Sequence, residues 1–218
     1  MISVFRVGST LSLVVGITLI LSACKGNDTP PPPPATSKSP ENAPSTERVV
    51  GPLSEEDAKA LATMNDRLKE YVDLHLKLEK TLPKLPEKAT PEQIDKNQRA
   101  LETMMQEARA TAKPGDLFTA EASPVIKRLL ATVFSGPDGK QLKASIMDEN
   151  PVDPAKLKLT VNARYPDVVP LASVPPQVLQ TLPKLSEDLE YRFIGDWLIL
   201  LDSHAHTIAD FIDNALPK

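Results

Sequence analysis

The residues best suited to chemistry lie near the C-terminus, where the chain reads Asp202-Ser203-His204-Ala205-His206. Two of the three histidines of the chain occur here, beside a carboxylate. Imidazole and carboxylate groups are common ligands of divalent transition metals. If the backbone stayed extended through Ala205, alternate side chains would share one face. Asp202, His204 and His206 are therefore the predicted metal ligands.

A second interpretation of this segment is a boundary between two elements. Thr207 is a plausible cap for a C-terminal helix, so the preceding strand would end at Asp202 and both histidines would lie in a turn. His206 would then stand beside a helix N-terminus, whose dipole disfavours protonation of the imidazole. The third histidine, His75, falls on the apolar stripe of a predicted helix. It is expected to be a core or rim residue and is an outside candidate for a further ligand.

Recognisable catalytic motifs are missing from the sequence. It contains no GxSxG, HExxH, GxxxxGK[ST], GxGxxG or EF-hand pattern, and its one cysteine, Cys24, permits no intramolecular disulfide. An enzyme without a recognisable motif stays an alternative, because paired carboxylates leave no local signature. A net charge of −4 and an aromatic content of 4% argue against nucleic acid as a partner. No cofactor other than a divalent metal is expected.

Residues 1–23 are predicted to be a secretion signal. Arg6 supplies a positive charge, and the apolar run from Leu11 to Leu21 is too short to span a bilayer comfortably. The ending Leu21-Ser22-Ala23-Cys24 resembles the lipobox of bacterial lipoproteins. The resemblance implies cleavage before Cys24 and acylation of that residue, with two or three acyl chains anchoring the protein firmly. The protein would be anchored to the cell membrane or the outer membrane, facing the periplasm or the exterior.

Residues 24–52 are predicted to be the acylated cysteine and a disordered stalk. Five consecutive prolines, Pro30 to Pro34, are followed by further prolines among small polar residues. Such a composition buries too little apolar surface to offset the entropy of ordering, and its polyproline part is stiff. The stalk is interpreted as a spacer that lifts the domain from the membrane; a motif for a proline-binding domain is the alternative. An envelope protein or the cell wall is the expected partner.

Residues 53–150 are predicted to be helical. An apolar stripe at spacings of three and four runs from Leu61 to Leu82, and Thr90 begins a second helix that ends at Pro114-Gly115. The two helices predict an antiparallel hairpin within one chain, with a coiled-coil dimer as the rival. Further helices are expected at residues 119–134 and 140–149.

Residues 151–218 are predicted to be a small mixed part. Strands are expected at residues 157–162 and 189–193, with a short helix from Pro175 to Leu182 between them. Gly195-Asp196 predicts a hairpin turn into Trp197–Leu201, which is apolar on both faces and so should be the central strand. Ile208, Phe211, Ile212 and Leu216 then predict a terminal helix.

The expected fold class is α+β. It comprises an N-terminal helical hairpin and further helices, packed with a small C-terminal antiparallel sheet and the terminal helix. Residues 53–218 are expected to form one folded unit.

Two resemblances concern this C-terminal part. Residues 189–212, LEYRFIGDWLILLDSHAHTIADFI, resemble a terminal motif of periplasmic nickel/cobalt-homeostasis proteins. Residues 116–217 are similar to uncharacterised exported bacterial proteins in the phrases GDLFT, NARYP and PPQVL. The first motif is largely a packing pattern, and the turn of that family does not call for His-x-His, so it carries no metal function over.

The sequence thus favours a lipid-anchored cell-envelope protein that acts by binding or structural support. The first alternative is an envelope metal-binding protein that uses Asp202, His204 and His206, and the second is an enzyme.

Overall fold

The computed structural model describes residues 53–149 and 152–218. All of them belong to one compact unit, Ser45–Lys218. The predicted signal peptide, Cys24 and the predicted stalk lie outside the described residues. Among the described helices, none combines the length and the hydropathy needed to cross a membrane.

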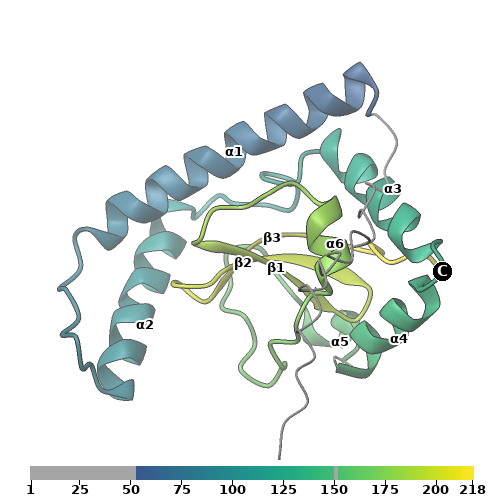
Figure 1. The fold of residues 1–218 in the computed structure, drawn as a ribbon. Helices are drawn as coiled ribbons and strands as arrows, with labels where there is room; N and C mark the ends of the chain where they lie inside the picture. The colour runs from purple at the N-terminus through teal and green to yellow at the C-terminus, as the bar shows by residue number, and fades with distance from the viewer. Residues whose placement is uncertain (1–52, 150–151) are drawn as a thin grey trace, which may run out of the picture. The chain divides into compact units, whose positions relative to one another are not determined.

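Two long helices open the described part of the chain. α1 (Glu55–Glu79) begins at Ser54, whose hydroxyl accepts the amide of Asp57 at 3.1 Å. α2 (Pro91–Ala108) begins with a reciprocal capping box between Thr90 and Gln93. Figure 1 shows α2 beneath the C-terminal end of α1 and α3 (Ala122–Phe134) beneath its N-terminal end. The stripe of α1 is therefore buried within the chain and needs no second copy to cover it.

Three shorter helices complete the helical content of the described residues. They are α4 (Gly139–Glu149), α5 (Pro154–Leu157) and α6 (Pro176–Thr181). α4 and α6 follow the sequence expectation closely, because each is bounded by turn residues or begins at proline.

A three-stranded antiparallel sheet lies beside the helices (Figure 1). Its order is β1 (Leu189–Ile194), β2 (Trp197–Asp202) and β3 (Thr207–Ile212), so β2 is central. Leu198 and Leu200 pack into the core with the helices, and Ile199 and Leu201 pack into a second cluster. The prediction of a central strand that is apolar on both faces is confirmed. The α+β fold class is confirmed as well.

The turn between β1 and β2 requires its glycine. Gly195 has a φ of +56°, and a Cβ there would lie 2.7 Å from Cδ of Pro154 and 2.9 Å from the carbonyl oxygen of Val152. The positive φ and the close approach of Val152 and Pro154 both exclude a side chain at position 195.

The predicted terminal helix is wrong: residues 207–212 form β3. Ala209 is the extra residue of a β-bulge, because Leu200 pairs with Asp210 and Leu201 pairs with Ile208. The bulge places Ile208 and Phe211 with the same core cluster although they are three residues apart. A strand with this bulge therefore imitates the spacing of a helix.

The predicted strand at residues 157–162 is also wrong. α5 ends at Leu157, and Lys158 and Asn162 have φ angles of +48° and +66°, which an extended strand does not allow. The side chain of Asn162 donates to the carbonyls of Gln106 and Arg109, both at 3.0 Å, and so holds the end of α2. Leu157 still packs into the second core cluster, which explains the alternation in the sequence.

A buried carboxylate joins the sheet to the loop before α3. Asp210 of β3 is fully buried and accepts the backbone N–H groups of Gly115, Leu117 and Phe118 at 2.8–3.1 Å. Hydrogen bonds to a charged acceptor are stronger than neutral ones, and the buried N–H groups of Leu117 and Phe118 would be unsatisfied without it.

We expect Asp210→Ala to lower the free energy of unfolding by about 2–4 kcal/mol, because it leaves the buried N–H groups of Leu117 and Phe118 without an acceptor. Urea denaturation of the full chain measures this change. The control is Asp213→Ala, whose carboxylate pairs with Lys127 at 3.3 Å and is 59% exposed. A loss for Asp210→Ala no larger than that of the control would contradict the assigned role.

Candidate metal centre

The segment that contains two of the three histidines is a turn between β2 and β3. Asp202 is the last residue of β2, and residues 203–206 form the turn before Thr207 opens β3. His206 has a φ of +54°, so the backbone does not stay extended. The one-face arrangement of Asp202, His204 and His206 is therefore not formed.

His206 lies apart from the other two histidines. Its ring meets the edge of Tyr165 at 5.7 Å between centroids, and its Nε2 is 3.9 Å from a carboxylate oxygen of Asp167. Burial, with the nearby charge of Arg164, lowers the pKa of His206 below its ordinary value.

His75 of α1 contacts Asp202 and His204, which lie at the turn between β2 and β3. Its side chain is fully buried, and its Nδ1 is 2.7 Å from Oδ2 of Asp202. The same oxygen accepts the hydroxyl of Tyr71 at 2.7 Å, while Oδ1 accepts the backbone N–H of Ala205 at 2.8 Å. Because a carboxylate only accepts, Nδ1 of His75 must carry the proton that it donates.

The other nitrogen of His75 has no hydrogen-bond partner among the described residues. This Nε2 is buried and lies 3.9 Å from Oδ1 of Asp188, the residue just before β1. A carboxylate that binds one imidazole nitrogen while the other is left free to ligate is the usual arrangement behind a metal-bound histidine. Asp202 therefore orients His75 from behind, and the free nitrogen faces Asp188.

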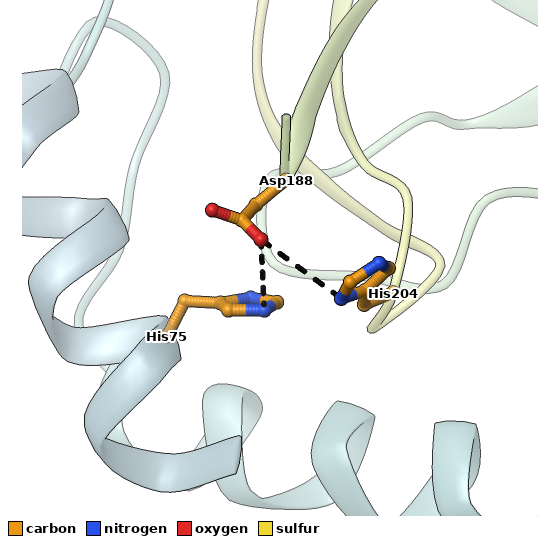
Figure 2. Close-up of side chains that lie close together, drawn as sticks. All are labelled: His75, Asp188 and His204. Atoms are coloured by element: carbon orange, nitrogen blue, oxygen red, sulfur yellow. Dashed lines mark ion pairs between the residues drawn. The ribbon is translucent and has the colours of Figure 1, made fainter. Parts of the chain in front are cut away.

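His204 approaches Asp188 from the turn. Its Nδ1 is 3.9 Å from Oδ1 of Asp188 and 3.2 Å from Oε1 of Glu79, and its ring lies 5.6 Å from that of His75. Figure 2 shows the side chains of His75, Asp188 and His204 pointing toward one another from three separate segments. One ligand atom from each lies within 4.8 Å of the other two.

These separations are close to those that a bound metal requires. A tetrahedral ion with ligands at about 2.0–2.2 Å places its ligand atoms about 3.3–3.6 Å apart. Two of the three separations are already 3.9 Å. A rotation of the His204 side chain, which is 53% exposed, would shorten the remaining separations.

Glu79 lies beside this group, with its Oε1 3.2 Å from Nδ1 of His204. It is the last residue of α1, one turn beyond His75 on the same helical face, and it is 37% exposed. His75, Asp188, His204 and Glu79 together offer two imidazoles and two carboxylates.

The charges of the site favour a cation. Burial disfavours the imidazolium form of His75, but the hydrogen bond and charge of Asp202, with Asp188 and Glu79 nearby, keep its pKa above the ordinary value. Burial and the charge of Asp202 raise the pKa of Tyr71 well above its ordinary value, so the phenol stays protonated and donates to that carboxylate. Below the raised pKa of His75, a proton on its Nε2 competes with a metal ion for the same nitrogen.

The sequence prediction found part of this arrangement. His204 belongs to the group and Asp202 orients His75 from behind it, but His206 does not join it. Asp188 and Glu79 were missed. Glu79 could have been indicated by its spacing, because it lies four residues after His75 on a helix. Asp188 lies in a polar loop with no distinguishing pattern.

Comparison of the chain with protein-family models, with curated proteins and with solved structures gave no match. The proposals below therefore depend on the residues and the geometry of this chain.

We expect the pKa values of His75 and the half-buried His206 to be shifted in opposite directions from the ordinary value. As the pH falls, His75 should take up its proton before His206, because the pKa of His75 is raised and that of His206 is lowered. Asp202→Asn removes the charge that holds the proton on His75, so the pKa of His75 should fall while that of His206 stays unchanged. NMR titration of the imidazole C–H signals in metal-free protein measures both values.

The sign of the linked stability follows from the raised pKa of His75. Its contribution to the metal-free fold is fully present below the unfolded-state pKa of about 6.5 and is lost as the pH rises through the folded-state pKa. Identical titration of His75 with and without the Asp202 carboxylate would contradict the assigned pairing.

Proposed function

We propose that this protein is a lipid-anchored cell-envelope protein that binds a divalent transition metal through His75, Asp188 and His204, with Glu79 as the fourth ligand. The observation that carries the metal proposal is the buried Nε2 of His75, which has no hydrogen-bond partner among the described residues and lies 3.9 Å from Oδ1 of Asp188. A buried imidazole nitrogen without a partner costs free energy, which a bound ion or proton offsets.

The type of ligand favours one class of metal. Imidazole nitrogen suits Zn²⁺, Ni²⁺ and Cu²⁺, whereas Mg²⁺ and Ca²⁺ prefer sites built from oxygen ligands. The support of His75 by Asp202 increases the basicity of the ligand and fixes its orientation. Affinity should follow the general order in which Cu²⁺ binds most tightly.

The proposed location depends on the N-terminal sequence. The lipobox-like Leu21-Ser22-Ala23-Cys24, the preceding apolar run and the proline-rich residues 24–52 together support an acylated, exported protein on a spacer. A metal-binding domain held in this way would act on ions of the periplasm or the exterior.

We expect the full chain, purified in detergent and stripped of metal, to bind one Ni²⁺, Cu²⁺ or Zn²⁺ with a Kd below about 0.1 mM, equivalent to about −5.5 kcal/mol. Isothermal titration calorimetry measures the affinity, and Mg²⁺ should give no binding heat. His204→Ala should weaken binding at least ten-fold, or about 1.4 kcal/mol. Because His204 is 53% exposed, this change should leave the core intact.

His206→Ala is the matched control, since it removes an imidazole two residues away that lies outside the group. Its affinity should stay within about two-fold of the wild-type value, well under 1 kcal/mol. Equal losses in the His204 and His206 variants, or no binding by the wild type, would overturn the metal proposal.

We expect Cys24→Ala to abolish the lipid anchor. The wild-type protein should lack residues 1–23 and carry a mass increase from acyl chains, and it should partition into the detergent phase. The variant should show neither the cleavage before residue 24 nor the added mass. Mass spectrometry measures both, and identical processing of the two proteins would contradict acylation at Cys24.

A further inference from the structure

A pocket lies beside Tyr71, whose hydroxyl donates to Asp202 of the candidate metal centre. Its volume is about 460 Å³, within the range of sites for small molecules. Residues of α1, including Tyr71 and Leu74, form one wall, and the loop that contains Gly115 and Leu117 forms another. Arg109, the residue directly after α2, also lines the pocket.

Arg109 is a half-buried cation without a carboxylate partner among the described residues. Its Cζ lies 4.7 Å from the centre of the Tyr71 ring, and Nη2 donates to the backbone carbonyl of Ala209 at 3.2 Å. Its Nη1 is buried and has no hydrogen-bond partner in the described part of the chain. One edge of the guanidinium fork is therefore unsatisfied, and its charge is not balanced by a direct ion pair.

The other polar groups of the pocket are already engaged. Arg67 pairs with Glu70 at 3.3 Å, and Asp116 accepts the backbone N–H of Lys113 at 3.0 Å. The amide of Gly115 is bound by Asp210 at 3.1 Å. Arg109 is thus the group in this pocket whose hydrogen-bonding capacity calls for a ligand.

We propose that this pocket binds a small organic carboxylate. The planar guanidinium matches a carboxylate in geometry and charge, so Arg109 would hold the anionic end. Tyr71 and Leu117 are buried beneath the pocket, and Arg109 covers the ring of Tyr71. The half-buried Leu74 would therefore contact the apolar body of the ligand. This site is independent of the metal proposal, although Tyr71 donates to the carboxylate that supports His75.

The test is an NMR titration of the full chain in detergent, stripped of metal and kept in a buffer without organic acids. Benzoate is the probe, and benzamide is its neutral control of the same shape. Benzoate should shift the amide signal of Gly115 and the Nε–H signal of Arg109 along a saturable curve, and benzamide should not. Arg109→Gln should weaken benzoate binding at least ten-fold.

Arg99→Gln is the matched variant, because Arg99 lies on α2, the helix that Arg109 follows, and pairs with Asp95 at 2.9 Å on the exposed surface. It should bind benzoate as the wild type does. The proposal is overturned if benzoate gives no saturable shifts or if benzamide binds the wild type equally well. It is also overturned if folded Arg109→Gln keeps its affinity. Because metal is absent throughout, failure of the metal proposal would leave this result unchanged.

Discussion

The buried carboxylate of Asp202 is the interaction on which the candidate site depends. It accepts from Tyr71 and His75 of α1 and from the backbone of the turn that follows β2, so one side chain joins the long helix to the sheet. A buried charge is tolerated only when its partners satisfy it, and removing one partner costs far more than the net worth of the pair. The position of α1 and the orientation of His75 are thus set by the same group. The free nitrogen of His75 is a consequence of that arrangement.

Asp202 and Asp210 are both buried and belong to adjacent strands, but they are satisfied in different ways. Asp210 is bound by backbone amides, which cannot lose a proton or rotate away. Asp202 is bound mainly by side chains, one of which titrates and offers a second nitrogen elsewhere. The first arrangement holds a loop through donors that do not titrate. The second transmits the state of a side chain to its surroundings, which is the property expected behind a binding site.

Local patterns predicted the elements that depend on local causes. Thr90 and Gln93 marked the start of α2, and the apolar faces of Trp197–Leu201 marked the central strand. The patterns failed where a distant contact decided the conformation. The bulge at Ala209 gives the apolar residues of β3 the spacing of a helix. The segment that contains Asn162 is not a strand, and the side chain of Asn162 is bonded to the end of α2 instead. The candidate site was predicted only in part for the same reason: its proposed ligands meet only through the fold, and Asp188 carries no signal along the chain.

Because His75, Asp188 and His204 come from three separate segments, the order of synthesis, folding and metal binding is restricted. More than a hundred residues separate the first ligand from the other two, so the group cannot assemble until the last strand pair has been synthesised and docked on α1. On the proposed export route, a chain that crosses the membrane unfolded would complete this group only after it has crossed. It would then take its metal from the compartment where folding finishes, and the supply of ions there, together with intrinsic affinity, would decide which metal it carries.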